Sequence, residues 1–326
     1  MTAPLKIAGG SILVTGGTGF IGSALVRALV RAGGRVRTLD DDSRGRRSRL
    51  ADCVGEIEMV VGDIRDRAAV MQAVSGVDAV LHLAYINGTE FFYKKPELVL
   101  EVAVKGMMNV LDACTAAGVR QLFLASSSEV YQQAPQIPTD ETAPLVVPDV
   151  LNPRYSYGGG KIISELLAIN YGRTRFERVV IFRPHNVYGP DMGREHVIPQ
   201  FALRLKQACA GTTGPVDFAI QGSGQETRAF IFIDDFVDGT LRVIERGQHL
   251  GIYHIGTQEE VTIAEVARHV AACFRREIRL VPGPLQPGGA PRRCPDIARL
   301  RALGFSPKTP LQDGIAATVA WYQQND

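Results

Sequence analysis

A tyrosine and a lysine stand four positions apart in the segment Tyr157-Gly158-Gly159-Gly160-Lys161. In a helix, side chains at i and i+4 share one face, so the phenol and the ammonium would be neighbours. A free tyrosine has a pKa near ~10, too high for a base at neutral pH, but a nearby cation favours the phenolate. The spacing therefore predicts a general base, Tyr157, whose pKa is lowered by Lys161.

Three serines in Ser126-Ser127-Ser128 follow an apolar run upstream of this tyrosine. We expect that run to be a buried strand, which would place a hydroxyl at the end of the strand. A serine there can hydrogen-bond the substrate oxygen from which the tyrosine removes a proton.

A glycine-rich turn, Thr15-Gly16-Gly17-Thr18-Gly19-Phe20-Ile21-Gly22, lies between an apolar strand and an apolar helix. Gly16 allows a tight turn, Gly19 lets backbone N–H groups approach a pyrophosphate, and Gly22 lets the helix pack closely. The spacing is GxxGxxG rather than GxGxxG, and its context still predicts a dinucleotide site.

An acid at the end of the second expected strand indicates which dinucleotide is bound. Asp40 can accept hydrogen bonds from the ribose of adenosine and repels a 2′-phosphate, which favours NAD over NADP. Arg44 and Arg46 leave NADP open, because guanidinium groups can bind such a phosphate. Asp63-Ile64, after the third strand, is placed to meet the adenine edge.

The first half of the chain alternates short apolar runs with amphipathic stretches, which predicts βαβ crossovers. We expect residues 11–184 to form a doubly wound α/β domain with a parallel Rossmann sheet. The expected strands are Ser11–Thr15, Arg35–Leu39, Glu58–Val61, Ala79–Ala84, Gln121–Ser126 and Val179–Phe182, and the main helices are Phe20–Arg31, Pro96–Ala117 and Tyr155–Tyr171.

Residues 185–326 have a different pattern, with strands and helices mixed and a cluster of proline and glycine at Pro282–Pro291. We expect a smaller mixed α/β lobe for the substrate, with some segments returning to the Rossmann domain. The expected helices are Ile198–Ala210, Asp234–Glu245, Ile263–Phe274 and Leu311–Tyr322, and the expected strands are Ala229–Ile233 and Gly251–Ile255.

Composition bounds the remaining classes. The 36 basic residues nearly balance the 34 acidic ones, which gives no signal for nucleic acid or membrane surfaces. The five cysteines form no CxxC pair, which predicts reduced thiols and no metal site. No apolar run approaches the roughly 18–20 residues that span a bilayer. A soluble, cytoplasmic protein is expected.

The chain resembles the extended short-chain dehydrogenase/reductase family, in particular its nucleotide-sugar epimerases, dehydratases and decarboxylases. The resemblance runs from about Ser11 to Tyr322. The segments that carry it are Thr15–Gly22, Gly62-Asp63-Ile64, His82-Leu83-Ala84, Ser126–Tyr131, Tyr157–Lys161, Arg183–Pro190, Gly222–Phe230 and Arg293–Asp296.

The resemblance implies a catalytic group of Ser127, Tyr157 and Lys161, with NAD as the cofactor. The contacts to NAD that it implies are Gly16, Gly19, Phe20, Ile21, Gly22, Asp40, Asp63, Ile64, Leu83, Ala84, Tyr157, Lys161 and Pro184.

The resemblance also implies a nucleotide-sugar substrate. Asn186 matches a residue near the substrate diphosphate, and Arg228 matches an arginine that grips it, a task suited to a guanidinium. Arg293 with Asp296 matches a pair at the nucleotide ribose. His196 is either an acid near the sugar or a structural histidine.

Several positions depart from the family pattern. Three consecutive glycines, Gly158–Gly160, precede the lysine although glycine costs roughly 1 kcal/mol relative to alanine in a helix. His185 stands where an aromatic residue is frequent, Ala103 where asparagine is common, and Gln132 where glycine is usual.

The family's shared first step is oxidation of a sugar hydroxyl, usually at C4, and its outcomes then diverge. We expect 4-epimerisation through a transient 4-keto sugar. Glu129, two residues beyond Ser127, keeps 4,6-dehydration and decarboxylation of a uronic acid open, unless it is a solvated acid at the strand end. Because Ser128 precedes Glu129, the Asp-Glu pair of dTDP-glucose-type dehydratases is missing. A non-catalytic NAD-binding scaffold would not need Ser127, Tyr157 and Lys161 together.

A homodimer is the expected assembly, because helices Pro96–Ala117 and Tyr155–Tyr171 often form a four-helix interface in this family. The apolar residues that could form that face, or equally pack on the sheet, are Val99, Val102, Gly106, Met107 and Val110.

Overall fold

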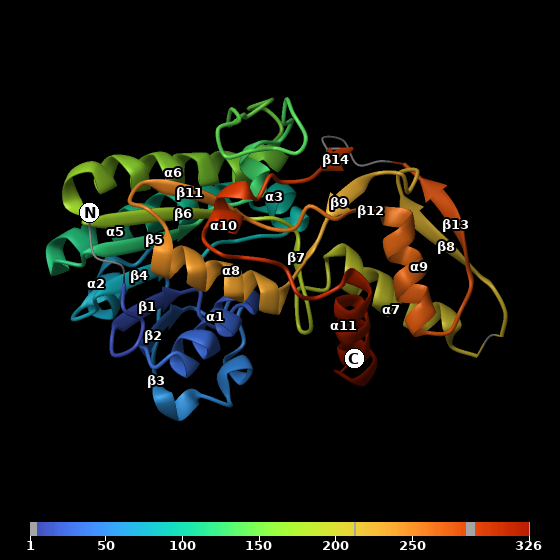
Figure 1. The fold of residues 1–326 in the computed structure, drawn as a ribbon, viewed down its shortest axis with the longest axis horizontal. Coiled ribbons are helices and arrows are strands. Elements are labelled where there is room, and N and C mark those ends of the chain that lie inside the picture. Colours follow the sequence, from blue (N-terminus) through green and yellow to red (C-terminus); the bar gives the residue numbers. More distant parts are fainter. Residues whose placement is uncertain (1–4, 212, 285–290, 326) are drawn as a thin grey trace.

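The computed structural model describes residues 5–211, 213–284 and 291–325. Its centre is a seven-stranded sheet in which every neighbouring pair is parallel (Figure 1). The strand order is β3-β2-β1-β4-β5-β6-β11, so the predicted doubly wound Rossmann sheet is confirmed. The strands are β1 (Ser11–Thr15), β2 (Arg35–Asp40), β3 (Ile57–Val61), β4 (Ala79–His82), β5 (Gln121–Ala125), β6 (Arg178–Pro184) and β11 (Gly251–Ile255).

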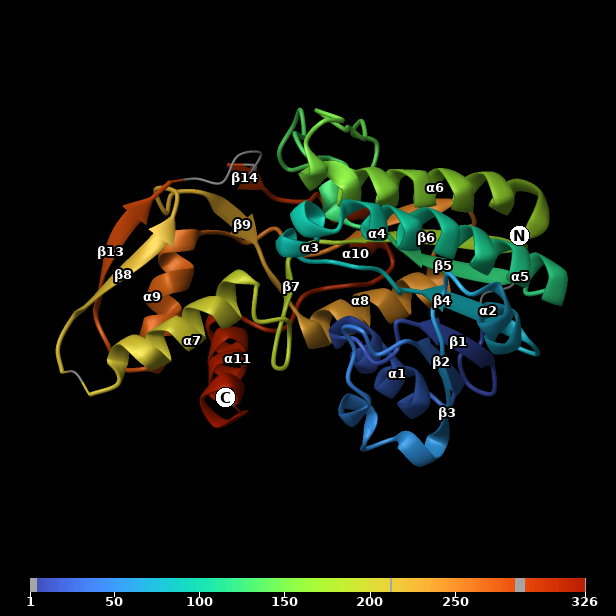
Figure 2. The same ribbon diagram turned by 180° about the vertical axis from the view of Figure 1, so that it is seen from behind.

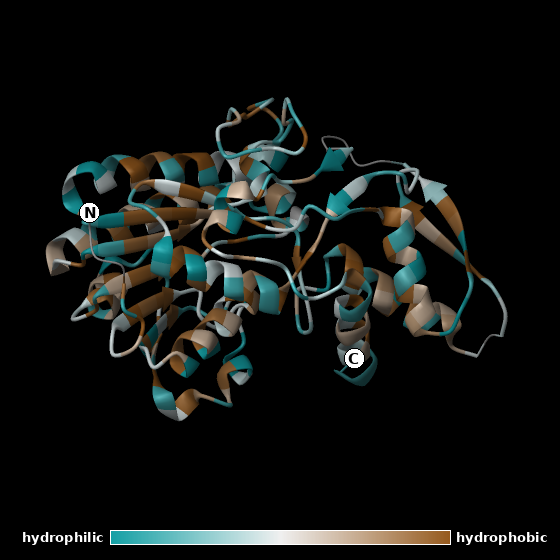
Figure 3. Cartoon of the chain, in the orientation of Figure 1, coloured by the Kyte–Doolittle hydropathy of each residue, from teal (hydrophilic) through white to brown (hydrophobic). Residues whose placement is uncertain are grey.

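Helices cover both faces of this sheet, which explains why its central strands are mostly apolar (Figure 3). All four residues of β4 and all five of β5 are buried. One face is covered by α2 (Arg67–Val74), α5 (Met107–Ala117) and α6 (Ser156–Arg175), and the other by α1 (Phe20–Arg31) and α8 (Ile233–Arg246) (Figures 1 and 2).

Two segments from the second half of the chain belong to the Rossmann layers. Strand β11 pairs with β6 at the edge of the sheet, and α8 packs against α1. The chain therefore leaves the sheet after β6, returns for α8 and β11, and leaves again.

The smaller lobe is mixed, as predicted. Strands β8 (Val216–Gln221) and β13 (Ile278–Gly283) form a parallel pair that the sequence analysis missed. A second small sheet has the order β12-β9-β14, and β7 pairs with β10. The remaining elements are β7 (Val187–Tyr188), β9 (Thr227–Ala229), β10 (Ile231–Phe232), β12 (Glu260–Thr262), β14 (Arg292–Arg293), α7 (Val197–Cys209), α9 (Ile263–Cys273), α10 (Ala298–Ala302) and α11 (Leu311–Asn325).

The expected strand Ala229–Ile233 is wrong in one respect. The segment splits at Phe230, because β9 pairs with β12 and β14 whereas β10 pairs with β7. Helix α8 already begins at Ile233. Of the predicted cluster Pro282–Pro291, residues 285–290 lie outside the described residues.

The expected helix Pro96–Ala117 is interrupted by a π-helical turn. Helix α4 (Pro96–Glu101) leads into this turn at Val102–Gly106, and α5 follows. The apolar residues proposed for a dimer face, Val99, Val102, Gly106, Met107 and Val110, are all buried within the chain, so their packing inside the protein is the correct alternative. Before α4 lies α3 (Thr89–Lys94).

The three glycines at the start of α6 differ in how much space surrounds their Cα atoms. A Cβ atom on Gly158 would lie 2.7 Å from the carbonyl oxygen of Glu129. A Cβ atom on Gly160 would overlap the hydroxyl group of Tyr85 and lie 2.7 Å from the Cβ atom of Ala103. Two of the glycines therefore allow close approach to other elements, which the sequence could not reveal.

Gly159 is the exception, because a Cβ atom there would meet only Val147 at an ordinary 3.5 Å. We expect Gly159→Ala to raise the free energy of unfolding by about 1 kcal/mol, since alanine favours the helix. The melting temperature should rise by roughly 2 °C. Gly158→Ala is the matched control and should lower it, because the Glu129 carbonyl belongs to the backbone. Thermal denaturation of both variants checks this, and equal losses of stability would contradict it.

Candidate active site

Tyr157 and Lys161 lie one turn apart near the start of α6. A 3₁₀ turn at Pro153–Tyr155 leads into this helix, and the Asn152 side chain accepts the N–H of Arg154 at 3.0 Å. Proline in the first turn and asparagine as the cap are typical helix-start residues. Both site residues are buried, with exposed fractions of 7% and 3%.

The phenol of Tyr157 is held by two aromatic rings. Phe92 stacks on it at a centroid distance of 5.0 Å, and Tyr85 contacts it edge-on at 5.1 Å. Burial raises the pKa of Tyr157 to about 12, against a hydrogen bond with the Ser127 side chain that lowers it. The sequence predicted a lowered pKa. In the structure, desolvation of the phenolate outweighs the stabilising contacts.

The ammonium of Lys161 lies 6.0 Å from the centroid of the Tyr157 ring and donates to the carbonyl of Ala125 at 2.7 Å. Burial lowers the pKa of Lys161 to about 7, against the charge of Glu165, which raises it. A lysine with such a pKa changes its charge near neutrality, so its surroundings decide how strongly it supports a phenolate.

The serines after β5 have separate partners. Ser127 caps the 3₁₀ turn Ser128–Val130, and its hydroxyl accepts the N–H of Glu129 at 3.1 Å. Ser126 instead donates to Glu165. Ser127 is therefore the serine that meets Tyr157, as the family pattern implied.

A buried polar network lies behind the Tyr–Lys pair, and the sequence analysis missed it. Arg183 on β6 binds Glu165 through two hydrogen bonds of 2.9 and 2.6 Å. It also donates to the hydroxyl of Tyr131, which bonds His254 on β11 at 2.6 Å. The glutamate four residues after the lysine on α6 was the available signal.

The glycine-rich turn has the geometry of an anion site. Gly16 has a φ of 73°, and a Cβ atom there would lie 2.8 Å from the backbone nitrogen of Ala84. A Cβ atom on Gly22 would overlap the carbonyl oxygen of Gly16. Gly19 caps α1 without a side-chain acceptor, and the first turn carries no acid. The N–H groups at this helix start and the helix dipole suit a pyrophosphate.

Asp40 ends β2 beside this turn. Its carboxylate accepts the N–H groups of Thr18 at 2.9 Å and Asp42 at 3.0 Å. Each oxygen can accept a further bond, which fits a ribose diol. The arginines that left NADP open are paired with acids instead, Arg44 with Glu195 and Arg46 with Asp191.

The other predicted cofactor residues lie near the same ends of the parallel strands as Asp40. Asp63 is bound by Arg65 at 2.6 and 2.9 Å; burial raises the pKa of this carboxyl, and the bonds from Arg65 reverse that and lower it. The backbone N–H groups of Leu83 and Ala84 bond the Thr15 hydroxyl at 3.2 Å. The contacts of all these residues with NAD stay predictions, and so do those of Phe20, Ile21, Ile64 and Pro184.

A carboxylate and three guanidinium groups gather beside the Tyr–Lys pair. Arg293 donates to Glu129 at 2.5 Å. Arg228 on β9 is the register partner of Arg293 on β14. Burial, then the charge of Arg293, lowers the pKa of Arg228 to about 10. Arg154 adds a third positive charge near Glu129, and its Nε atom is buried without a hydrogen-bond partner among the described residues.

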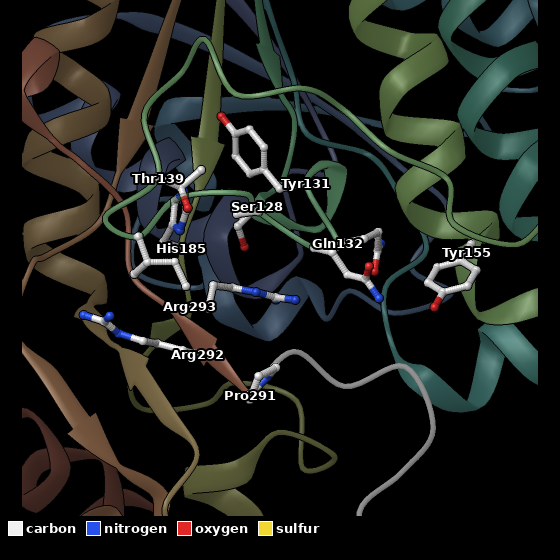
Figure 4. Close-up of a pocket in the computed structure, with 12 residues that line it drawn as sticks. Ser128, Tyr131, Gln132, Thr139, Tyr155, His185, Pro291, Arg292 and Arg293 are labelled. Atoms are coloured by element: carbon white, nitrogen blue, oxygen red, sulfur yellow. The ribbon is translucent and has the colours of Figure 1, made fainter.

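A cavity of about 420 Å³ adjoins this cluster. Figure 4 shows Arg293 reaching across it toward Gln132. The amide of Gln132 donates to the Glu129 carbonyl at 2.6 Å, so Gln132, which stands where glycine is usual, has a defined role in the turn. The cavity wall includes Ser128, Tyr131, Gln132, Thr139, Tyr155, His185, Arg292 and Arg293.

Two predicted substrate residues lie apart from Glu129. Asn186 has a positive φ of 42° and donates to the carbonyl of Ala229 at 2.8 Å, at the end of the strand that carries Arg228. His196 begins α7 beside the ion pair of Arg44 with Glu195. The structure thus groups Glu129 with Arg154, Arg228 and Arg293, and places His196 near Arg44 and Glu195.

Among the described residues, no cluster of three or more His, Cys, Asp or Glu side chains is arranged to hold a metal ion. Within the same residues, no helix has the length and apolar character needed to cross a membrane.

Comparison with known proteins places this geometry in a family. The sequence model of the NAD dependent epimerase/dehydratase family matches residues 12–256. A curated relative is UDP-N-acetyl-alpha-D-glucosaminuronate decarboxylase of Bacillus cytotoxicus, 30% identical over 322 residues that cover 96% of this chain and 97% of the relative.

Solved structures are similarly close. The dTDP-glucose 4,6-dehydratase of Streptomyces venezuelae with NAD and TYD bound has a TM-score of 0.86, 30% identity and 97% coverage of each chain. The UDP-glucose 4-epimerase of Thermus thermophilus in complex with NAD has a TM-score of 0.85 and 28% identity, covering 97% of this chain and 100% of the other.

These relatives are named for three different activities. The comparison therefore does not decide which of these activities this chain has. The two solved structures share the fold of this chain, whose glycine-rich turn between β1 and α1 has the features of a dinucleotide site. The chain belongs to the NAD-dependent epimerase/dehydratase family, and NAD is its cofactor.

Proposed function

We propose that the protein oxidises C4 of a nucleotide-linked hexuronic acid and removes its C6 carboxylate as carbon dioxide. The observation that carries this proposal is the Glu129–Arg293 pair, held beside Tyr157 and flanked by Arg154 and Arg228. A diphosphate accounts for the charge of Arg228, and a C6 carboxylate would give Arg154 and Arg293 an anionic partner as well.

The first step uses residues already in place. Tyr157 takes the proton of the C4 hydroxyl, and Ser127 hydrogen-bonds the same oxygen. Lys161 stabilises the phenolate and can hold the ribose next to the nicotinamide. The glycine-rich turn and Asp40 would hold NAD, which would supply the acceptor, and later the donor, of the hydride at C4.

The second step follows from the chemistry of the ketone. A C4 ketone makes the C6 carboxylate a β-keto acid, so the C5–C6 bond can break with its electron pair passing to the C4 oxygen. Tyr157, now protonated, donates to that oxygen, and Ser127 supports it. A proton from water replaces carbon dioxide at C5, and reduction of the C4 ketone completes the cycle.

Charge complementarity supports an anionic sugar. Three guanidinium groups and one carboxylate leave this corner of the site with excess positive charge. The guanidinium group of Arg228 is suited to bind a diphosphate. The C6 carboxylate can accept hydrogen bonds from Arg293 and from the Nε atom of Arg154. Glu129 positions Arg293 through their 2.5 Å contact.

The alternatives differ in what they require. A 4,6-dehydration needs an acid that protonates the C6 hydroxyl, and Ser128 occupies the position next to Glu129. Simple 4-epimerisation, which the sequence favoured, requires only Ser127, Tyr157 and Lys161. It is the second candidate, because Glu129 is neutralised by Arg293 and could serve only to hold the arginine.

A panel of UDP-, dTDP-, GDP-, ADP- and CDP-linked glucuronic acids and neutral sugars, incubated with enzyme and NAD, distinguishes these reactions. The expected product has lost carbon dioxide, as seen by mass spectrometry. An isomer of unchanged mass from a neutral sugar would replace the proposal with epimerisation, and NMR would identify the inverted centre.

Replacing Tyr157 by phenylalanine removes the proposed base while keeping the ring contacts with Phe92 and Tyr85. Turnover should fall by about 10³-fold or more, because a positioned general base contributes roughly 10²–10⁴-fold. NAD affinity, measured by fluorescence or calorimetry, should be nearly unchanged. Wild-type turnover in this variant would show that Tyr157 is not the general base.

Replacing Glu129 by glutamine keeps its shape but removes the charge that pairs with Arg293. Decarboxylation should fall by roughly 10²-fold, because Arg293 loses the partner that holds it in place, whereas an epimerase would keep most of its rate. Arg279→Gln is the control, because Arg279 makes a comparable ion pair with Asp217 on the surface. Full carbon dioxide release from Glu129→Gln would remove this residue from the mechanism.

We also propose a homodimer, through exposed apolar side chains on α4 and α6. Leu100, Ile163 and Leu166 have exposed fractions of 38%, 39% and 58%, and the two helices pack against each other. Leu166→Glu should convert a dimer into a monomer, because it places a charge in the apolar interface. Light scattering after size exclusion measures the mass. A wild-type monomer would refute the assembly.

A further inference from the structure

Tyr85 contacts both members of the Tyr–Lys pair, although no motif pointed to it. It follows β4, just after Leu83 and Ala84. The Lys161 ammonium lies 3.7 Å from the centroid of its ring, much closer than the 6.0 Å to the ring of Tyr157. At 3.7 Å the ammonium lies against the ring of Tyr85.

The hydroxyl group of Tyr85 makes a second set of contacts. It donates to the backbone carbonyl of Tyr157 at 3.3 Å. It occupies the place that a Cβ atom of residue 160 would need, and Gly160 leaves that place open. The edge-on contact with the Tyr157 ring completes the arrangement. Gly160 therefore costs helix stability and in return lets Tyr85 reach the start of α6.

We propose that Tyr85 is a positioning residue for the catalytic pair, with its ring face holding the Lys161 ammonium in its charged form and its hydroxyl group holding the backbone at Tyr157. The proposal rests on the roles given above to Tyr157 and Lys161. Tyr85 acts through these two groups. Its removal therefore changes the pH at which Tyr157 acts as a base, in addition to any effect on the amount of folded protein.

The groups that face Lys161 come from several elements. Glu165 on α6 raises its pKa, and burial lowers it. Burial, and then the positive charge of Lys161, lowers the pKa of His82 on β4 to about 3, so this imidazole is neutral. The carbonyl of Ala125 on β5 accepts a bond from the ammonium. Burial raises the pKa of Tyr85, so its phenol stays neutral and its ring is a dipolar partner.

The direct test measures Lys161 itself. Protein labelled with ¹³C at lysine Cε is titrated by NMR, and Lys161→Met identifies the signal. In Tyr85→Leu, which removes the aromatic face, the titration midpoint of Lys161 should fall by about one pH unit. In Tyr85→Phe, which keeps the face and loses the hydroxyl group, the midpoint should stay within error of wild type.

A second set of variants keeps the shape of the ring, in case leucine disturbs the fold. Phenylalanine with one, two or three ring fluorines at position 85 weakens the attraction for a cation stepwise, because fluorine withdraws electron density from the ring face. The Lys161 midpoint should fall with each fluorine. A midpoint that ignores both the fluorines and Tyr85→Leu would overturn the proposal.

Turnover gives an independent readout. Loss of charge on Lys161 raises the pKa of Tyr157, so the rising limb of kcat against pH should move to higher pH in Tyr85→Leu, with little change in KM. A merely structural role would lower kcat equally at every pH, and that result would also overturn the proposal. The NMR titration needs no substrate, so a wrong choice of substrate cannot be mistaken for failure of this inference.

Discussion

The buried ion pair between Glu165 and Arg183 joins α6, which carries Tyr157 and Lys161, to the sheet. Their side chains are 4% and 2% exposed, and the guanidinium makes two hydrogen bonds to the carboxylate. Breaking a buried pair by removing one partner typically costs about 3–5 kcal/mol, because the other charge is left without compensation. Glu165 also receives the Ser126 hydroxyl and acts on the charge of Lys161. The position of α6 and the electrostatics of the base therefore depend on one interaction.

The same pair is connected to the segment of the chain that carries Arg293. Arg183 reaches Tyr131, which bonds His254 on β11. The other ring nitrogen of His254 bonds the carbonyl of Asp296, three residues after Arg293. Arg293 is thus held against Glu129 by a network that begins at the Rossmann sheet. Strand β11, which returns to the sheet, thus connects Arg183 with the segment that carries Arg293.

Much of this architecture could be predicted from the sequence, because its signals are local. The alternation of apolar runs indicated the parallel strands, and the glycine spacing and Asp40 indicated the dinucleotide site. The pairing of Ser127 with Tyr157 followed from the family pattern. The features that could not be predicted are those that depend on burial and on contacts between distant segments. The raised pKa of Tyr157 reflects desolvation, and the pairing of β8 with β13 joins segments that carry no local signature of a partner.

Two neighbouring arginines in the small lobe repel each other. Arg228 and Arg293 are register partners on adjacent strands, so two like charges face each other in a partly dry corner. Like charges placed opposite one another destabilise a sheet. An anion that settles between them relieves this repulsion, and by linkage it stabilises the folded chain as it binds. Part of the affinity for a polyanion at this corner would therefore come from relief of the repulsion between the two arginines, and a bound polyanion would raise the melting temperature.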